Sequence, residues 1–112
     1  DRKKKPETEL KTIEIKKTMG WCNDIRSKKH YNKLIKISSI LKHEKLFRKD
    51  YKYDFVIPIN YNTKNIKIGK GSAIFIHLSK RLLPTAGCIA LRKKDFLILV
   101  KIINKNTKIK LI

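Results

Sequence analysis

The segment GKGSAIFIHL, residues 69–78, carries the strongest strand signal in the chain and decides the predicted fold. From Ala73 to Leu78 the residues are apolar on both faces, which is the pattern of a strand covered on both sides. We therefore predict a central, buried strand over residues 72–77 and a sheet built around it.

Two further segments extend this prediction. In YDFVIPINY, residues 53–61, alternate residues are apolar or aromatic, which indicates a strand, and Pro58 indicates an edge or an end of the sheet. Asp95 suits the positive end of a helix dipole, and the following FLILVKII has one apolar stripe at helical spacing. We predict a helix over roughly 93–104.

The remaining segments complete a mostly β prediction of the α+β class, with one or two helices. The expected elements are strands over residues 34–38 and 107–112, a brief helix over 41–49, a turn over 20–24 (GWCND) and extended chain over 7–19.

The chain is short and strongly basic. Its 112 residues suit one domain, and 29 Lys+Arg against 9 Asp+Glu give a formal charge of +20. This charge favours polyanionic partners such as nucleic acid, anionic lipid or an acidic cell-wall polymer, although an AT-rich coding sequence would give the same excess of Lys, Ile and Asn. No run of about 18 apolar residues is present, so no transmembrane segment is expected.

The start of the chain and its cysteines set further expectations. The opening DRKKKPETEL has no initiator Met and no apolar signal core, so we expect a fragment or a processed form. Cys22 and Cys88, with three scattered histidines, make no zinc pattern. No metal and no other cofactor is expected.

Cys88 and His77 are a candidate catalytic pair. Gly87 lets backbone N–H groups approach a reacting carbonyl, and the predicted helix start just after Cys88 would lower the pKa of its thiol. His77 ends the predicted central strand, and a loop over 79–86 could bring its imidazole to the thiol. The alternative is that Cys88 fills the core and His77 is a hydrogen-bonded histidine at a strand end, and spacing alone favours this alternative.

The stretches GSAIFIHL and PTAGCIALRKKDF resemble the catalytic stretch of the L,D-transpeptidases, the YkuD-like cysteine enzymes of peptidoglycan. The signature of that family is a strand carrying a His, a loop, and then Ser/Thr-His-Gly-Cys followed by an apolar residue. In this chain His77 matches the His of the strand, Thr85 the Ser/Thr, and Gly87 and Cys88 the Gly-Cys pair.

The chain departs from the family pattern at two positions. Ala86 replaces the second histidine of the signature, and Ala90 stands where many members carry Arg. The loop between His77 and Cys88 is also shorter than in most members. The combination of IFIHL with PTAGC-x-AL resembles a proteobacterial branch of the family, and GWCND with the YN pair at 31–32 fits that branch as well.

The resemblance implies a YkuD-like β-sandwich or barrel whose N-terminal strands lie before Asp1. It implies one catalytic domain over 1–112, in which 1–19 form a peripheral lead-in and 20–112 resemble the C-terminal two-thirds of the family domain. It further implies a location in the periplasm or cell envelope, peptidoglycan stem peptides as substrates, and inhibition by carbapenem-type β-lactams.

The chemistry that the resemblance implies is a two-step acyl transfer. Cys88 attacks a carbonyl of a stem peptide, and an amine of a neighbouring stem resolves the thioester. His77 acts as general base, with its tautomer held by a backbone carbonyl near Leu78, while the N–H groups of Gly87 and Cys88 form the oxyanion hole. The expected substrate-binding residues are Thr85, Leu78, Arg92, Tyr31 and Trp21.

Several alternatives stay open. Trp21, with Cys22 beside it, either walls the donor site or anchors the core, and the second role is favoured; Arg92 is a substitute carboxylate ligand or a solvated residue. The acceptor could be water, which would make the protein an L,D-carboxypeptidase or amidase. A basic nucleic-acid-binding β domain would use the charge and stack bases on Tyr51, Tyr53 and Phe55. Lysines spread along the whole chain, without an RNP-type or zinc-knuckle motif, argue against that domain, so no nucleic-acid partner is expected.

Overall fold

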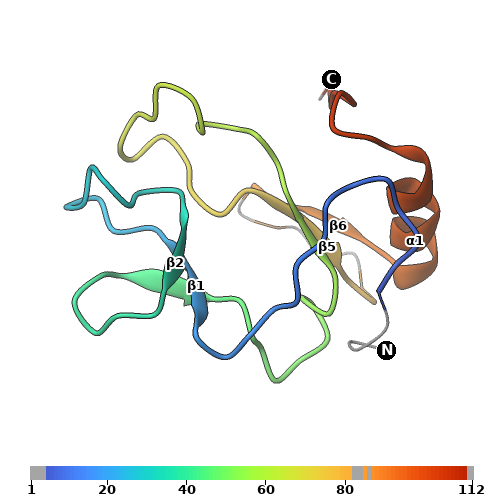
Figure 1. The fold of residues 1–112 in the computed structure, drawn as a ribbon, viewed down its shortest axis with the longest axis horizontal. Helices are drawn as coiled ribbons and strands as arrows, with labels where there is room; N and C mark the ends of the chain where they lie inside the picture. Colours follow the sequence, from blue (N-terminus) through green and yellow to red (C-terminus); the bar gives the residue numbers. More distant parts are fainter. Residues whose placement is uncertain (1–4, 82–84, 86, 111–112) are drawn as a thin grey trace.

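The computed structural model describes residues 5–81, 85 and 87–110. Within them the chain forms two three-stranded sheets and one C-terminal helix (Figure 1), which confirms the predicted mostly β, α+β class. The first sheet is antiparallel, with the order β2-β1-β3, and contains β1 (Met19–Cys22), β2 (Leu34–Lys36) and β3 (His43–Lys45). The second has the order β4-β5-β6 and contains β4 (Val56–Pro58), β5 (Phe75–Leu78) and β6 (Ile89–Leu91).

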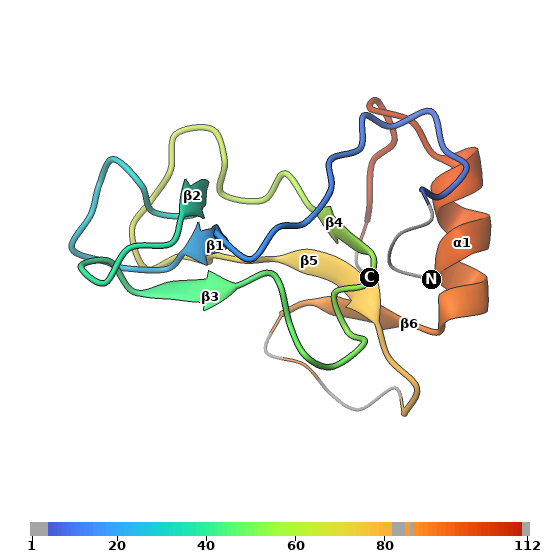
Figure 2. The ribbon, with the colours of Figure 1, turned by 60° about the horizontal axis from the view of Figure 1, so that its bottom comes forward.

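The second sheet lies between the first sheet and the helix α1 (Lys93–Ile102), as Figure 2 shows. The N-terminal segment runs beside α1 before it enters β1 (Figures 1 and 2). Its Thr8 hydroxyl donates a hydrogen bond to the carbonyl oxygen of Val100, at 2.6 Å. The segment thereby covers part of the helix.

β5 is the central strand of the second sheet, as predicted. It pairs antiparallel with β4 and parallel with β6, and all four of its residues are buried. Pro58 ends β4, an edge strand, in agreement with the expected position of that proline. Because the polar backbone of a central strand is paired on both edges, β5 can be buried at no hydrogen-bonding cost.

β5 begins at Phe75, later than the predicted residue 72. Ala73 has a φ of 58°, in the left-handed region, which interrupts the extended backbone. That conformation costs a non-glycine residue roughly 1–2 kcal/mol and requires support from its surroundings. Ala73 is buried, and its N–H donates a hydrogen bond of 3.2 Å to the side-chain oxygen of Asn32.

The two faces of β5 contribute to two different cores. Ile76 and Leu78 pack on the side of α1, where the buried residues also include Phe55, Phe96 and Val100. Phe75 faces the opposite side and packs in a second core with Leu46, Tyr53 and Ala73, to which residues of the first sheet contribute. Each face of β5 therefore holds one layer of the molecule against it.

The helix prediction is confirmed to within two residues at its end. α1 has Asp95 in its first turn and buries Phe96 and Val100, one turn apart, against the sheet. Ile103 then adopts extended dihedral angles and ends the helix.

The strands predicted over 34–38 and 53–61 are shorter than expected, at Leu34–Lys36 and Val56–Pro58. Three further segments differ from the prediction in type. The turn predicted over 20–24 is wrong for residues 20–22, which belong to β1. This is the middle strand of the first sheet, and its residues Gly20 and Cys22 are buried. The predicted brief helix over 41–49 is wrong, since 43–45 form β3 and pair with β1. Residues 107–110 form no strand, and residues 111–112 lie outside the described part of the chain.

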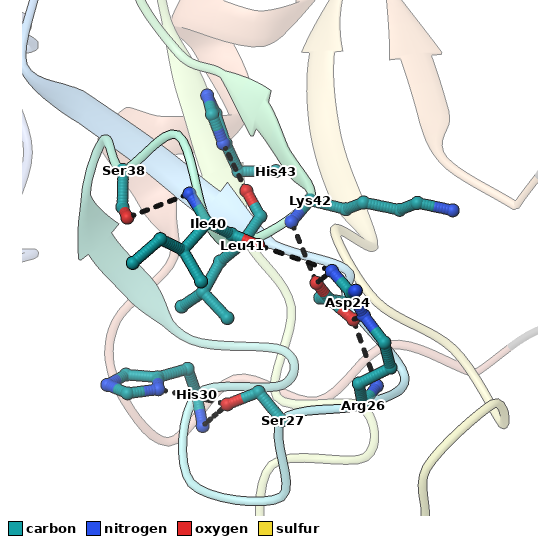
Figure 3. Close-up of polar contacts among 9 residues, drawn as sticks. All are labelled: Asp24, Arg26, Ser27, His30, Ser38, Ile40, Leu41, Lys42 and His43. Carbon is teal, nitrogen blue, oxygen red and sulfur yellow. Dashed lines mark hydrogen bonds and ion pairs between the residues drawn. The ribbon is translucent and has the colours of Figure 1, made fainter.

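The turn in the GWCND segment falls on Asp24, just after β1 (Figure 3). Its buried carboxylate accepts hydrogen bonds from the backbone N–H and the guanidinium of Arg26 and from the backbone N–H of Lys42, at 2.7 to 3.0 Å. These bonds tie the segment after β1 to the segment before β3. The side-chain hydrogen bond from Arg26 is the main reason why the pKa of Asp24 lies far below its usual value.

Phe96→Ala tests how much α1 depends on the core beside β5. Removing this buried ring should lower the free energy of unfolding by about 3–5 kcal/mol, because the cavity can close only in part. Ile98→Ala is the matched control on the same helix, since Ile98 is 54% exposed, and it should change the free energy by at most about 0.5 kcal/mol. Urea denaturation of both variants measures the difference, and equal losses would contradict the packing.

Asp24→Asn tests the turn. A carboxyl with a lowered folded-state pKa stabilises the fold above its unfolded pKa of about 3.9, and this contribution disappears as the pH falls through the folded value. The variant should therefore be less stable than the unmodified chain at pH 7, and the gap should narrow below pH 4. Denaturation midpoints at pH 7, 4 and 2.5 measure it. A gap that is constant with pH would show that the carboxylate charge is not involved.

Candidate active site

His77 and Cys88 lie on the same face of the second sheet. In the parallel pairing of β5 with β6, His77 is the partner of Ala90, and Cys88 is two residues before Ala90 along the same strand direction. Alternate residues of a strand point to the same side, so Cys88 shares the face of Ala90 and His77. This is the face directed away from α1, because Ile89 and Leu91 pack into the core on the helix side.

The thiol of Cys88 is held by the backbone that leads into β5. Sγ donates a hydrogen bond to the carbonyl oxygen of Ala73 at 3.2 Å and accepts one from the N–H of Phe75 at 3.4 Å. The sequence predicts that the imidazole of His77 comes within reach of the thiol, but among the described residues no hydrogen bond joins the two side chains. The left-handed conformation of Ala73 thus accompanies a direct contact with the candidate nucleophile.

The hydrogen bond of His77 selects the tautomer that a base of this type requires. The imidazole is 9% exposed, and its Nδ1 lies 2.9 Å from the carbonyl oxygen of Leu78. A carbonyl only accepts, so we assign the proton to Nδ1, which leaves Nε2 as the acceptor. The backbone carbonyl predicted near Leu78 is present, whereas the Leu78 side chain is buried on the helix side of the sheet.

The environment of the thiol differs from the one expected. Cys88 precedes a strand, β6, and α1 starts only at Lys93, so the thiol is not at a helix start. Burial raises the pKa of Cys88 above its usual value; the hydrogen bond from Phe75 lowers it and the charge of Glu44 raises it. The resting group is a neutral thiol, which needs a base to become a nucleophile.

The loop before Cys88 is closed by a local hydrogen bond. The hydroxyl of Thr85 donates to the carbonyl oxygen of Cys88. Gly87 has a φ of 135°, which side-chain-bearing residues rarely adopt, and a Cβ there would meet Ile74 Cδ1 at 3.2 Å. Glycine is therefore needed at this position. Position 86, where Ala replaces the second histidine of the family signature, lies outside the described residues.

The other residues predicted to bind substrate occupy different places. Trp21 is half-buried between the sheets, edge-on to Phe75 at 5.1 Å, with its indole N–H donating to the side-chain oxygen of Asn32 at 2.9 Å. Tyr31 is buried, and its hydroxyl accepts a hydrogen bond from the N–H of Gly71 at 3.4 Å. Arg92 is exposed at the start of α1, beyond the end of β6 that is far from Cys88.

Two residues beside the pair were not predicted as site residues. The hydroxyl of Tyr53 donates a hydrogen bond to the carboxylate of Glu44 on β3, and its ring lies edge-on to both Phe75 and His77, at 5.7 Å in each case. Burial, and then Glu44, raise the pKa of Tyr53 well above its usual value. Recognising Glu44 from the sequence would have required the strand β3 to be predicted, and the sequence pattern over 41–49 predicts a helix instead.

The structure also bears on the alternatives. Tyr53 and Phe55 are buried, so neither offers an exposed ring on which a base can stack. The ring of His30 contacts the hydroxyl of Ser27, and the ring of His43 contacts the carbonyl oxygen of Leu41 (Figure 3). Within the described ranges, no three His, Cys, Asp or Glu side chains cluster as metal ligands, and no helix is long and apolar enough to cross a membrane.

Comparison of the chain with models of protein families, with curated proteins and with solved structures found no match.

The reactivity of the two cysteines tests this geometry. Both are free thiols; Cys22 is fully buried and Cys88 half-buried. Iodoacetamide should therefore label Cys88 alone in the native protein. The rate should keep rising up to and beyond pH 9, because burial disfavours the thiolate. Peptide mass spectrometry after timed labelling at pH 6 to 10 measures it, and a rate that levels off below pH 8 would contradict a neutral resting thiol.

Proposed function

We propose that this protein is a cysteine-dependent acyltransferase of the L,D-transpeptidase type, acting on peptidoglycan stem peptides in the periplasm or cell envelope. The observation that carries the proposal is that His77 on β5 and Cys88, directly before the parallel strand β6, share one face of the sheet, while Nδ1 of His77 contacts a backbone carbonyl. The sequence resemblance around both residues supports it. The two sheets and helix are compatible with a YkuD-like fold, which we include in the proposal.

In the first step, Nε2 of His77 takes the proton of the Cys88 thiol as the sulfur leaves its backbone partners and attacks the carbonyl carbon of the stem peptide. A C–S bond forms and the peptide C–N bond breaks, and the imidazolium returns the proton to the departing amine. The N–H groups of Gly87 and Cys88 stabilise the oxyanion. Gly87 suits this role because it has no side chain to obstruct the approach of the carbonyl.

In the second step, an acceptor attacks the thioester and frees the sulfur. An amine of a neighbouring stem gives a cross-link, and water gives a carboxylate. Analysis of muropeptides after incubation of the protein with tetrapeptide-containing sacculi separates the two. Cross-linked products identify a transpeptidase, tripeptides alone identify a carboxypeptidase, and unchanged muropeptides would refute the proposal.

A carbapenem tests the nucleophile and the base directly. The strained β-lactam should acylate Cys88, and Cys88→Ala should abolish both the adduct and turnover. His77→Ala should slow acylation by about two to four powers of ten, the range expected when a general base is lost. Cys22→Ser is the matched control and should keep the adduct. Intact-protein mass spectrometry measures all four proteins, and undiminished acylation of Cys88→Ala would show that another residue is the nucleophile.

A further inference from the structure

Glu44 is a carboxylate beside the candidate site in a chain with few acids. The sequence has 9 Asp+Glu against 29 Lys+Arg. Ion pairs hold Asp24 to Arg26, Asp50 to Arg48 and Glu7 to Lys101. Among the described residues Glu44 has no such ion pair, and its contact is the hydroxyl of Tyr53. Arg48 lies over the Tyr53 ring and interacts electrostatically with Glu44, but its ion pair is with Asp50. A half-buried carboxylate that is outside an ion pair is suited to bind a cation that arrives with a ligand.

Two sets of contacts connect Glu44 with the candidate nucleophile. Tyr53 donates its hydroxyl proton to Glu44 and lies edge-on to His77 and Phe75. On the first sheet, Glu44 pairs with Trp21, which also lies edge-on to Phe75. The N–H of Phe75 in turn contacts the sulfur of Cys88. Glu44 and Trp21 therefore line the side of the first sheet that faces the pair, with Tyr53 beside them, and the negative charge of Glu44 acts on the thiol.

We propose that Glu44, held by Tyr53, binds the positively charged amine of the acceptor stem peptide. This inference rests on the proposed acyltransferase function and assigns its second step. The carboxylate attracts the ammonium form and holds it beside the thioester. The amine loses one proton to solvent and attacks the carbonyl carbon; a C–N bond forms, the C–S bond breaks, and His77 passes the second amine proton to the sulfur of Cys88.

The role of Glu44 predicts a preference among acceptors. Water and neutral nucleophiles gain nothing from a carboxylate, whereas a cationic amine gains a charge-assisted contact. Loss of Glu44 should therefore lower transfer to an amine and spare hydrolysis. Acylation should not become slower, because Glu44 disfavours the thiolate.

The experiment measures the fate of one acyl-enzyme with three acceptors. A synthetic tetrapeptide stem serves as donor; a tripeptide with a free diaminopimelate amine, hydroxylamine and water are the acceptors. At the same pH the diaminopimelate amine is cationic and hydroxylamine is neutral. Glu44→Gln should lower the ratio of amine transfer to hydrolysis about tenfold to a hundredfold, the range for a lost charged hydrogen bond. The ratio for hydroxylamine should stay the same.

A control and a second test accompany this variant. Glu9→Gln removes one exposed carboxylate from the N-terminal segment and so changes the net charge by the same amount as Glu44→Gln. It should leave both ratios unchanged. Tyr53→Phe is a second test: it keeps the ring but removes the hydroxyl that holds Glu44, and it should also lower the ratio of amine transfer to hydrolysis. If Glu44→Gln does not fold, Tyr53→Phe and the salt dependence of the unmodified protein still test the role of Glu44. Added salt should slow the transfer to the cationic amine and leave the transfer to hydroxylamine and water unchanged.

Each remaining outcome overturns the inference in a recognisable way. Equal loss of both ratios in Glu44→Gln would mean that Glu44 only supports the fold of the site. An unchanged amine ratio would mean that the acceptor binds elsewhere. Acylation without any amine transfer by the unmodified protein would leave the acyl-enzyme proposal standing and remove this one, whereas absence of acylation would remove both.

Discussion

The burial of β5 on both faces is the constraint on which the rest of the structure depends. Its residues Phe75 and Ile76 are almost completely removed from solvent, one toward each core. Because such a strand must have both edges paired, it fixes β4 and β6, and through β6 it fixes the start of α1. The first sheet joins by covering Phe75 with Trp21, and Tyr53, in the segment between β3 and β4, also packs against the Phe75 ring.

The same strand organises the candidate site. Phe75 supplies the N–H that contacts the sulfur of Cys88, and His77 stands two residues further along the strand. Packing and chemistry therefore share the same few residues, and the imidazole is held in place by the core that Tyr53 and Phe75 build. The fold therefore makes the site rigid, but a substitution in the core around Phe75 would also disturb the site.

Features that depend on neighbouring residues in the sequence could be predicted for this chain, whereas features that depend on contacts between distant segments could not. The central strand and the helix follow from continuous apolar patterns, and Pro58 marks an edge strand because it lacks an N–H. β1 and β3 could not be predicted because their signal is pairing between distant segments. Gly20 and Cys22 are typical of a turn until their strand partners Lys45 and His43 are known. For the same reason His77 and Cys88 can be proposed from sequence, while Glu44 and Tyr53 become site residues only through tertiary contacts.

The position of Trp21 gives the molecule a built-in optical probe. It is the only tryptophan in the chain, and it packs edge-on to Phe75 at the junction of the two sheets. Its emission should shift to longer wavelength when the sheets separate and water reaches the indole, so unfolding can be followed without any label. Because Phe75 also contacts Cys88, occupation of the sulfur should alter the intensity of the same emission, and a stopped-flow fluorimeter could then time the chemistry on the unmodified protein.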